Sequence, residues 1–443
     1  MVDGVQAARS SGSLLKPFLY PLSIDQGLVL PSTKIRDIPT FYGPFSPANA
    51  DEQYRGLVTV HDALVHSLNV PAVRLLNLFG YADFYDYLKA MGLQHLFRAA
   101  DDYGLPLILG GAEVSVWEMA TLFRGLALGG KFSSISCFNQ REFQKGNSTA
   151  KTAKSAKFIK YIQNAQSSGS LFNFALRNSG NSVVKKEIDT SLGNNSIQLI
   201  SPGAAYQTLQ ILRELNRPGS EYYWQQYQDQ WPLAWKTGTS YGQRDAWAVG
   251  VSPQWTIAVW AGNFTGEGNP ELAGSKSAGP ILFDLFNMLP KDKNNSWFGR
   301  PEMDFKTIHL CAWSGYLASE NCPETIAVDA PSGMRPLRLC PWHEKLFVDD
   351  QEKYQVCSLC WQNGHYHAVS KLVLPPDISQ YLRQQGQLIE NVPLHNPECP
   401  AEQNADVLEI IYPTENARLW IPREYGGAYQ KVTCKAAHRH SSV

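Results

Sequence analysis

The stretch between residues 231 and 264 most constrains how this chain can fold. It holds three segments rich in β-branched and aromatic residues, WPLAWKTGTS, DAWAVGVSP and WTIAVWAGNF, with turn residues between them. Strands that follow one another with such short links pair antiparallel. The sequence therefore predicts an antiparallel sheet here, with a helix over residues 281–289 packed against it.

Helical periodicity dominates the chain before this sheet. Apolar side chains recur at helical spacing between residues 13 and 130, and the pattern over residues 113–128 ends at Gly129 and Gly130, a helix stop signal. A further amphipathic helix is predicted over residues 202–215. Helices packed on an antiparallel sheet place the chain in the α+β class.

Composition and charge limit the classes of partner. The 443 residues allow two or three domains, and a net charge of −1 argues against a nucleic-acid partner. Residues 1–9 hold no apolar core of a secretory leader, and no stretch reaches the roughly 18 apolar residues of a membrane span. We therefore expect that this chain by itself neither exports nor anchors itself. Residues 131–198, rich in Ser, Asn, Lys and Gly, are expected to form a surface excursion rather than a basic binding patch.

The first chemical motif is Ser13-Leu14-Leu15-Lys16. A spacing of three places Ser13 and Lys16 on one face of a helix, one turn apart. A serine hydroxyl becomes a nucleophile when a neighbouring base accepts its proton, and a lysine whose pKa is lowered by burial and nearby positive charge can be that base. We therefore predict Ser13 as a nucleophile and Lys16 as its base.

The second motif, Ser67-Leu68-Asn69, offers a hydroxyl for proton relay and an amide for hydrogen bonding to a substrate. His61 and His66 lie nearby, but we expect them to be ordinary surface or satisfied side chains, because Lys16 already supplies the base.

The third motif, Lys236-Thr237-Gly238-Thr239, lies on the first predicted strand. Lys236 offers a cation, and Thr237 and Thr239 offer hydroxyls, to a substrate carboxylate. A glycine inside a strand, here Gly238, indicates that a ligand or another backbone approaches closely.

The three motifs occur in the order found in penicillin-binding proteins and class A β-lactamases, which this chain resembles. The runs RGLVTVHDALVHSLNVPAVRLL, LGGAEVSVWEMATLFRGLALGG and KTGTSYGQRDAWAVGVSPQWTIAVWAGN are similar to the bifunctional, class A penicillin-binding proteins. The cysteine-rich stretch after residue 300 and the run EIIYPTENARLWIPRE resemble the penicillin-binding protein 1C branch of that family. The resemblance covers nearly the whole chain apart from residues 131–198.

The resemblance implies a β-lactamase/transpeptidase-like fold and a peptidoglycan D,D-transpeptidase that cross-links stem peptides through a serine acyl-enzyme. Ser13 would attack the penultimate D-Ala carbonyl, and Lys16 would accept its proton. Ser67 would relay a proton to the leaving D-Ala amine.

Binding roles follow from the same resemblance. Asn69 would hold the peptide, and Lys236, Thr237 and Thr239 would bind its terminal carboxylate. Backbone N–H groups of Ser13 and Thr239 would form the oxyanion hole.

The implied partners are stem peptides ending in D-Ala-D-Ala, β-lactams as covalent inhibitors, and other cell-wall synthesis proteins, at the periplasmic face of the inner membrane. No cofactor and no metal site is expected. Three alternatives stay open: a D,D-carboxypeptidase, in which water replaces the acceptor amine, a β-lactamase, and a non-catalytic penicillin-binding scaffold.

The expected domains are a transpeptidase domain over residues 1–295, a Cys- and Pro-rich linker over 296–402, and the start of a C-terminal β domain over 403–443. Family members carry a membrane anchor and a glycosyltransferase domain ahead of the transpeptidase, whose sheet begins with strands upstream of the nucleophile. We therefore expect this chain to be a fragment of a longer product, with those first strands missing.

Eight cysteines are present, and five fall within one fifty-residue stretch. Cys357 and Cys360 with Cys340 and His343 have the spacing of a zinc knuckle. The periplasmic location implied by the resemblance favours disulfides instead, with no pairing assigned.

Overall fold

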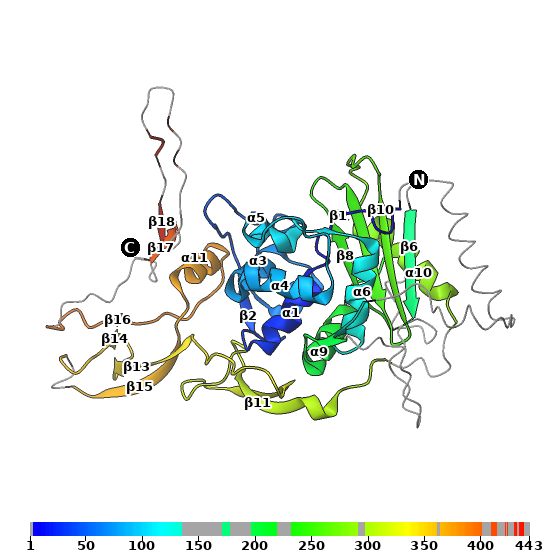
Figure 1. The fold of residues 1–443 in the computed structure, drawn as a ribbon. Helices are drawn as coiled ribbons and strands as arrows, with labels where there is room; N and C mark the ends of the chain where they lie inside the picture. The colour runs from blue at the N-terminus through cyan, green and yellow to red at the C-terminus, as the bar shows by residue number, and fades with distance from the viewer. Residues whose placement is uncertain are drawn as a thin grey trace, which may run out of the picture.

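The fold is shown in Figure 1 as a computed structural model of the chain. It describes residues 3–134, 171–177, 196–218, 232–290, 297–360, 364–400 and 409–413, with positions 421, 423, 429–431 and 434–437. Helices and antiparallel strands occur together in these ranges, as the predicted α+β class requires. Every helix in them falls short of the length and hydrophobicity needed to span a bilayer.

The predicted antiparallel sheet is present, with four strands in the order β6-β10-β9-β8. Three of them are the predicted strands: β8 (Ala234–Thr239), β9 (Asp245–Val251) and β10 (Trp255–Gly262). Every residue of β9 is buried, because α6 (Val116–Ala127) covers one face of the sheet and α10 (Gly279–Met288) covers the other (Figure 1). A sheet covered on both faces explains why β9 and β10 are almost continuously apolar.

The fourth strand comes from the segment expected to be a surface excursion. β6 (Leu171–Arg177) pairs antiparallel with β10 along its full length. The expectation of a surface excursion is wrong for residues 171–177, because they form a strand of the sheet. β10 therefore lies between β6 and β9 and is not an edge strand. Residues 135–170 and 178–195, with the lysines that suggested a basic patch, lie outside the described residues. Two short strands, β5 (Lys131–Phe132) and β7 (Ile197–Gln198), pair at the two ends of the segment.

The predicted helical region packs against one face of the sheet (Figure 1). Its central helix, α1 (Lys16–Asp25), is buried along nearly its whole length because it is apolar on all sides. α1 begins at Lys16, so Ser13 lies in the preceding turn, and the prediction that one helix carries both residues is wrong by one turn. The other helices are α2 (Val60–Val65), α3 (Asn69–Phe79), α4 (Tyr81–Met91), α5 (Ala100–Tyr103) and α9 (Pro202–Arg213).

Two small strand pairs lie among the helices of this layer. β2 (Lys34–Asp37) pairs antiparallel with β3 (Gly56–Thr59), and β1 (Arg9–Ser10) pairs with β4 (Glu113–Val114). The β1–β4 pair fixes the chain immediately before the turn that holds Ser13.

The stretch expected to be a linker contains regular β structure. β11 (Phe305–Cys311) pairs with β12 (Thr325–Pro331), and β13 (His343–Asp349) pairs with β15 (Tyr366–Leu372). α11 (Pro376–Gln384) follows. The remaining strands are β14 (Tyr354–Gln355), β16 (Leu394–His395), β17 (Glu409–Tyr412) and β18 (Lys435–Ala437). In Figure 1, β11 runs below α1 and α9, while β14 and β16 lie at the far end of the molecule from the sheet.

Candidate active site

Lys16, the first residue of α1, has a fully buried side chain. Its Nζ donates hydrogen bonds to the backbone oxygens of Ser67 (2.7 Å) and Leu68 (3.1 Å) and to Oδ1 of Asn69 (2.8 Å). All three acceptors are uncharged. Burial therefore lowers the pKa of Lys16 well below its usual value, and the positive charge of Lys236 lowers it further.

Lys236 extends from β8 toward the same point. Its neighbour Trp235 packs edge-on against Phe283 of α10, so alternation along the strand directs Lys236 to the opposite face of the sheet, where the helical layer lies. Lys236 Nζ donates to Ser67 Oγ at 2.7 Å and to the backbone oxygen of Thr237 at 2.9 Å. Burial lowers the pKa of Lys236 to about 7.

Ser67 is the residue that both lysines contact. It lies in the turn between α2 and α3 with a φ of 54°, a left-handed conformation that serine seldom adopts. Backbone hydrogen bonds from Ser67 N to Leu64 O (3.1 Å) and from Leu68 N to Ala63 O (2.9 Å) hold the turn. Because of this geometry, the backbone oxygen of Ser67 faces Lys16 and its hydroxyl faces Lys236.

A residue that none of the predicted motifs contains supports this turn. Asn49 is buried, and its Oδ1 accepts hydrogen bonds from the backbone N–H groups of Asn69 (2.8 Å) and Val70 (3.2 Å) at the start of α3. Its Nδ2 donates to Oδ1 of Asp37 at the end of β2 (2.8 Å). Its Nδ2 also donates to the backbone oxygen of Gln53 at 2.8 Å. No sequence signal marks Asn49, because its partners in the turn lie 20 and 21 residues away in the chain.

The turn that carries Ser13 lies directly against the edge of β8. A Cβ atom on Gly12 would lie 2.7 Å from the backbone N of Thr239, and one on Gly238 would lie 2.8 Å from the backbone O of Ser11. Only glycine permits two backbones to approach so closely. The prediction that something approaches Gly238 closely is confirmed, and the neighbour is the turn before α1.

The strand register sets the direction of the Thr239 amide. Ser240 N donates to Asp245 O at 3.0 Å, so Ser240 belongs to a hydrogen-bonded pair of the β8–β9 ladder. Thr239, opposite Ala246, is then a non-hydrogen-bonded position, and its N–H points away from β9 toward the Gly12 turn. Ser13 itself is half-buried, and its hydroxyl makes no hydrogen bond with any part of the chain that the structure describes.

The structure therefore brings the three predicted motifs to one place. Both lysines, the Ser67 hydroxyl and the backbone amide of Thr239 meet where α1, the α2–α3 turn and β8 converge. Among the described residues, no carboxylate bonds to Lys16 or Lys236. The site thus holds two buried amines without a carboxylate partner beside the Ser13 hydroxyl, which suits an anionic substrate and nucleophilic attack.

Neither histidine near the second motif joins this cluster. His61 lies between Asp62 (3.1 Å) and Glu214 (3.0 Å), and His66 is exposed.

The cysteines do not form the favoured disulfides. All seven described cysteines are free, so the preference for disulfides is wrong for them, while Cys137 lies outside the described residues. The zinc-knuckle alternative also grouped its four residues incorrectly: Cys340 and His343 lie in one cluster, and Cys357 and Cys360 lie in another.

The chain is similar in sequence and in fold to known proteins. Residues 2–287 match the family described as penicillin binding protein transpeptidase domain. The chain is 32% identical over 339 residues to penicillin-binding protein 1C of Escherichia coli (strain K12), covering 76% of this chain and 37% of that protein. It is 27% identical over 282 residues to penicillin-binding protein 1F of Bacillus subtilis (strain 168), covering 63% of this chain and 34% of that protein. The chain thus spans about a third of the length of the curated relatives it matches.

A solved structure shares the fold. The crystal structure of penicillin-binding protein 1A from Haemophilus influenzae superposes with a TM-score of 0.51 at 18% sequence identity, over 76% of this chain and 50% of that one.

Proposed function

Because the chain belongs to the penicillin-binding protein transpeptidase family, we propose that it is a serine-type D-Ala-D-Ala transpeptidase of peptidoglycan synthesis. The observation that supports this most directly is the contact of Ser67 with both Lys16 and Lys236 beside the Ser13 turn. We assign the catalytic domain to residues 1–295, followed by a segment over 296–402 and the start of a β domain over 403–443.

Acylation begins at Ser13. Burial lowers the pKa of Lys16 and so favours its neutral amine. A neutral amine donates only two hydrogen bonds, so one of the three Nζ contacts is released and the lone pair accepts the Ser13 hydroxyl proton while Oγ bonds to the penultimate D-Ala carbonyl carbon. The N–H groups of Ser13 and Thr239 stabilise the oxyanion that develops, a contribution of roughly a hundredfold or more in rate per donor.

The peptide C–N bond then breaks. The Ser67 hydroxyl donates its proton to the leaving nitrogen and takes one in turn from the lysine ammonium groups around it, and free D-Ala departs. Lys236 in its charged form, with Thr237 and Thr239, holds the terminal carboxylate, and Asn69 holds the peptide. The amine of a second stem peptide attacks the acyl-enzyme, which forms the cross-link and returns the proton to the Ser13 hydroxyl.

The proposed partners follow from this reaction. The donor and acceptor are stem peptides, and β-lactams acylate Ser13 because they imitate the terminal D-Ala-D-Ala. The reaction takes place at the periplasmic face of the inner membrane, beside other cell-wall synthesis proteins.

Covalent labelling tests the nucleophile. A fluorescent penicillin is expected to label the wild-type chain, and Ser13→Ala is expected to abolish labelling. Ser23→Ala is the matched control, because Ser23 lies on α1, which follows the Ser13 turn, and its buried hydroxyl has no hydrogen-bond partner among the described residues. Labelling retained in Ser13→Ala, or absent from folded wild-type protein, would overturn the proposal, and the second result would support a non-catalytic scaffold.

A donor–acceptor assay tests the reaction type. A stem peptide ending in D-Ala-D-Ala is incubated with an amine acceptor, and the products are resolved by mass spectrometry. The cross-linked peptide is expected. Hydrolysed donor alone would identify a D,D-carboxypeptidase, and rapid release of the penicilloyl label would identify a β-lactamase.

A further inference from the structure

The region after residue 300 holds two clusters, each made of three cysteines and one histidine. We propose that each cluster binds one Zn²⁺ ion as a structural site. The first consists of Cys311, Cys322, Cys340 and His343, and the second of Cys357, Cys360, His395 and Cys399. In each cluster the four ligand atoms lie within 4.8 Å of one another.

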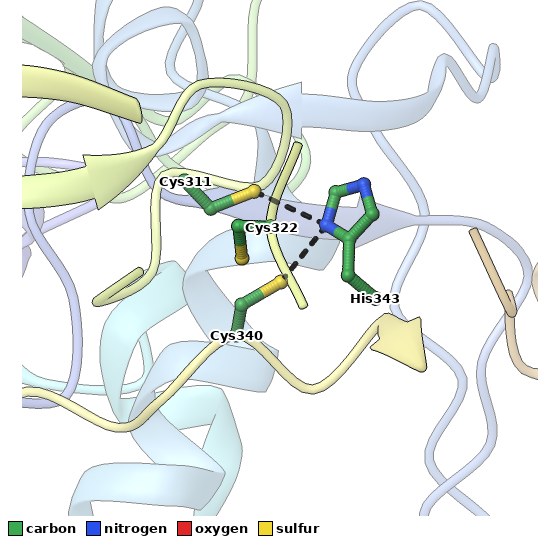
Figure 2. A group of neighbouring side chains, drawn as sticks. All are labelled: Cys311, Cys322, Cys340 and His343. Atoms are coloured by element: carbon green, nitrogen blue, oxygen red, sulfur yellow. Dashed lines mark hydrogen bonds between the residues drawn. The ribbon is translucent and has the colours of Figure 1, made fainter. Parts of the chain in front are cut away.

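The first cluster forms where two strand pairs meet. Cys311 ends β11, His343 begins β13, and Cys322 and Cys340 come from the loops between them. Figure 2 shows the three sulfur atoms and the imidazole pointing toward a common centre. His343 Nδ1 lies 3.3 Å from Cys311 Sγ and 3.4 Å from Cys340 Sγ.

The second cluster has the same composition. Cys357 Sγ lies 3.6 Å from Cys399 Sγ and 3.8 Å from Cys360 Sγ, and Cys360 Sγ lies 3.6 Å from His395 Nε2. All four residues are half-buried, in the β14–β16 region.

These separations fit tetrahedral zinc. Zn–S bonds of about 2.3 Å and Zn–N bonds of about 2.0 Å place sulfur atoms about 3.8 Å apart and sulfur about 3.5 Å from nitrogen. A disulfide requires about 2.05 Å between sulfurs. Three cysteines in each cluster also leave one unpaired in any disulfide scheme, whereas three thiolates and one imidazole complete a closed Cys₃His site.

The surroundings of the sulfur atoms favour thiolates. Backbone N–H groups donate to Sγ of Cys311 from Ser314 (3.4 Å) and to Sγ of Cys322 from Ser319 (3.3 Å). In the second cluster the N–H of Cys357 donates to Cys360 Sγ at 3.1 Å. Such bonds from the outer shell orient metal ligands and stabilise their negative charge.

Each cluster combines a short turn with two more distant ligands. Cys340 and His343 are three residues apart, as are Cys357 and Cys360, which is the knuckle spacing of structural zinc sites. With four protein ligands, neither cluster has an open position for water or substrate, so both ions are structural rather than catalytic.

Metal content of the full chain, purified without chelators, tests the proposal. Two zinc ions per wild-type chain are expected, one in Cys322→Ser, one in Cys360→Ser and none in the double variant. Cys434→Ser is the control and keeps two ions, because Cys434 is exposed and belongs to neither cluster. His343→Cys, which replaces imidazole with a fourth thiolate, is expected to keep two ions.

If a variant does not fold, two measurements on the wild-type protein still test the proposal. Replacement of zinc by Co²⁺ is expected to give the visible absorption of tetrahedral thiolate coordination, and thiol titration after denaturation is expected to find the ligand cysteines reduced. Fewer than two ions per chain, or disulfide-linked peptides from Cys311, Cys322, Cys340, Cys357, Cys360 or Cys399 in a non-reducing digest, would overturn the proposal.

Discussion

At the scale of single residues, the site depends on two buried lysines that need opposite charge states. Lys16 acts as a base only when neutral, and Lys236 binds a carboxylate only when charged. Burial lowers the pKa of both lysines, and the positive charge of Lys236 lowers the pKa of Lys16 further. The geometry thus separates two identical side chains into two roles by their environment.

This separation predicts the pH dependence of penicillin acylation. The pKa of Lys236 is about 7 in the free protein, so its charged fraction falls as pH rises through that value. The second-order acylation constant is expected to fall by about tenfold per pH unit above pH 7. Lys236→Arg is expected to remove this alkaline limb, because a guanidinium stays charged. Stopped-flow acylation by benzylpenicillin measures both profiles, and a flat wild-type profile between about pH 6 and about pH 9 would contradict the assignment.

Gly12 sets how closely the nucleophile turn approaches β8. It has a φ of 52°, and a Cβ there would press on the Thr239 backbone. Gly12→Ala is therefore expected to displace Ser13 from the Thr239 amide and to slow penicillin acylation roughly a hundredfold. Gly266→Ala is the matched control: Gly266 also has a positive φ, 77°, but open space around its Cβ position, so only backbone strain is added. Equal acylation rates in the two variants would show that the close approach is unimportant.

At the scale of elements, the α2–α3 turn depends on Asn49. Removing this buried amide takes a hydrogen bond from Asp37 Oδ1 and from the Gln53 backbone oxygen, and leaves two N–H groups of α3 without their acceptor. Asn49→Ala is expected to lower the free energy of unfolding by about 1–3 kcal/mol. Acylation is also expected to slow, because Ser67 and Asn69 lose their support. Asn77→Ala, an exposed position on α3, is the control for thermal unfolding and acylation. Identical behaviour of the two variants would contradict a positioning role for Asn49.

The elements also show what the sequence can predict. β8, β9 and β10 follow from local patterns of β-branched and aromatic residues, and the three motifs are short runs whose chemistry is readable without a fold. β6 carries a local signal of its own, the apolar and aromatic run LFNFAL, but Ser-, Asn- and Lys-rich residues surround it and its partner β10 lies about 80 residues later, so the run alone does not predict a strand of this sheet. The start of α1 was misplaced because Ser13 is held by the β1–β4 pair and the edge of β8, which are long-range contacts.

At the scale of the whole molecule, the region after residue 300 is attached to the helical layer by several contacts. Gln207 of α9 donates to the Asp329 backbone oxygen at 2.8 Å, and Arg36 of β2 forms an ion pair with Asp377 of α11 at 2.8 Å. Arg335 N donates to the backbone oxygen of Asp25, the last residue of α1, at 2.9 Å. The helix that begins with Lys16 therefore ends against this region.

The two proposed zinc sites differ in their distance from that attachment. Beside the first site, the Ser314 backbone oxygen accepts from Lys34 N (2.9 Å), the Gly315 oxygen accepts from Thr33 Oγ1 (2.8 Å), and Lys34 Nζ lies 3.9 Å from the Trp313 ring centre. The second site lies at the far end of the molecule, at β14 and β16 (Figure 1). Loss of the first ion should therefore loosen the segment leading from α1 to β2, while loss of the second should not.

Cys322→Ser and Cys360→Ser are a matched pair for this difference, because both thiols are half-buried and each variant removes one ligand. Cys322→Ser is expected to lower the Tm of the penicillin-binding unit by roughly 5 °C or more, since a loss of 1 kcal/mol shifts a domain of this size by about 2–4 °C. Cys360→Ser is expected to leave that Tm unchanged. The transition is identified by thermal unfolding with and without covalently bound penicillin, because only the unit that carries the acyl group responds. An equal shift in both variants would mean that the two ions stabilise one cooperative unit, and no shift in either would mean that the first site does not support α1.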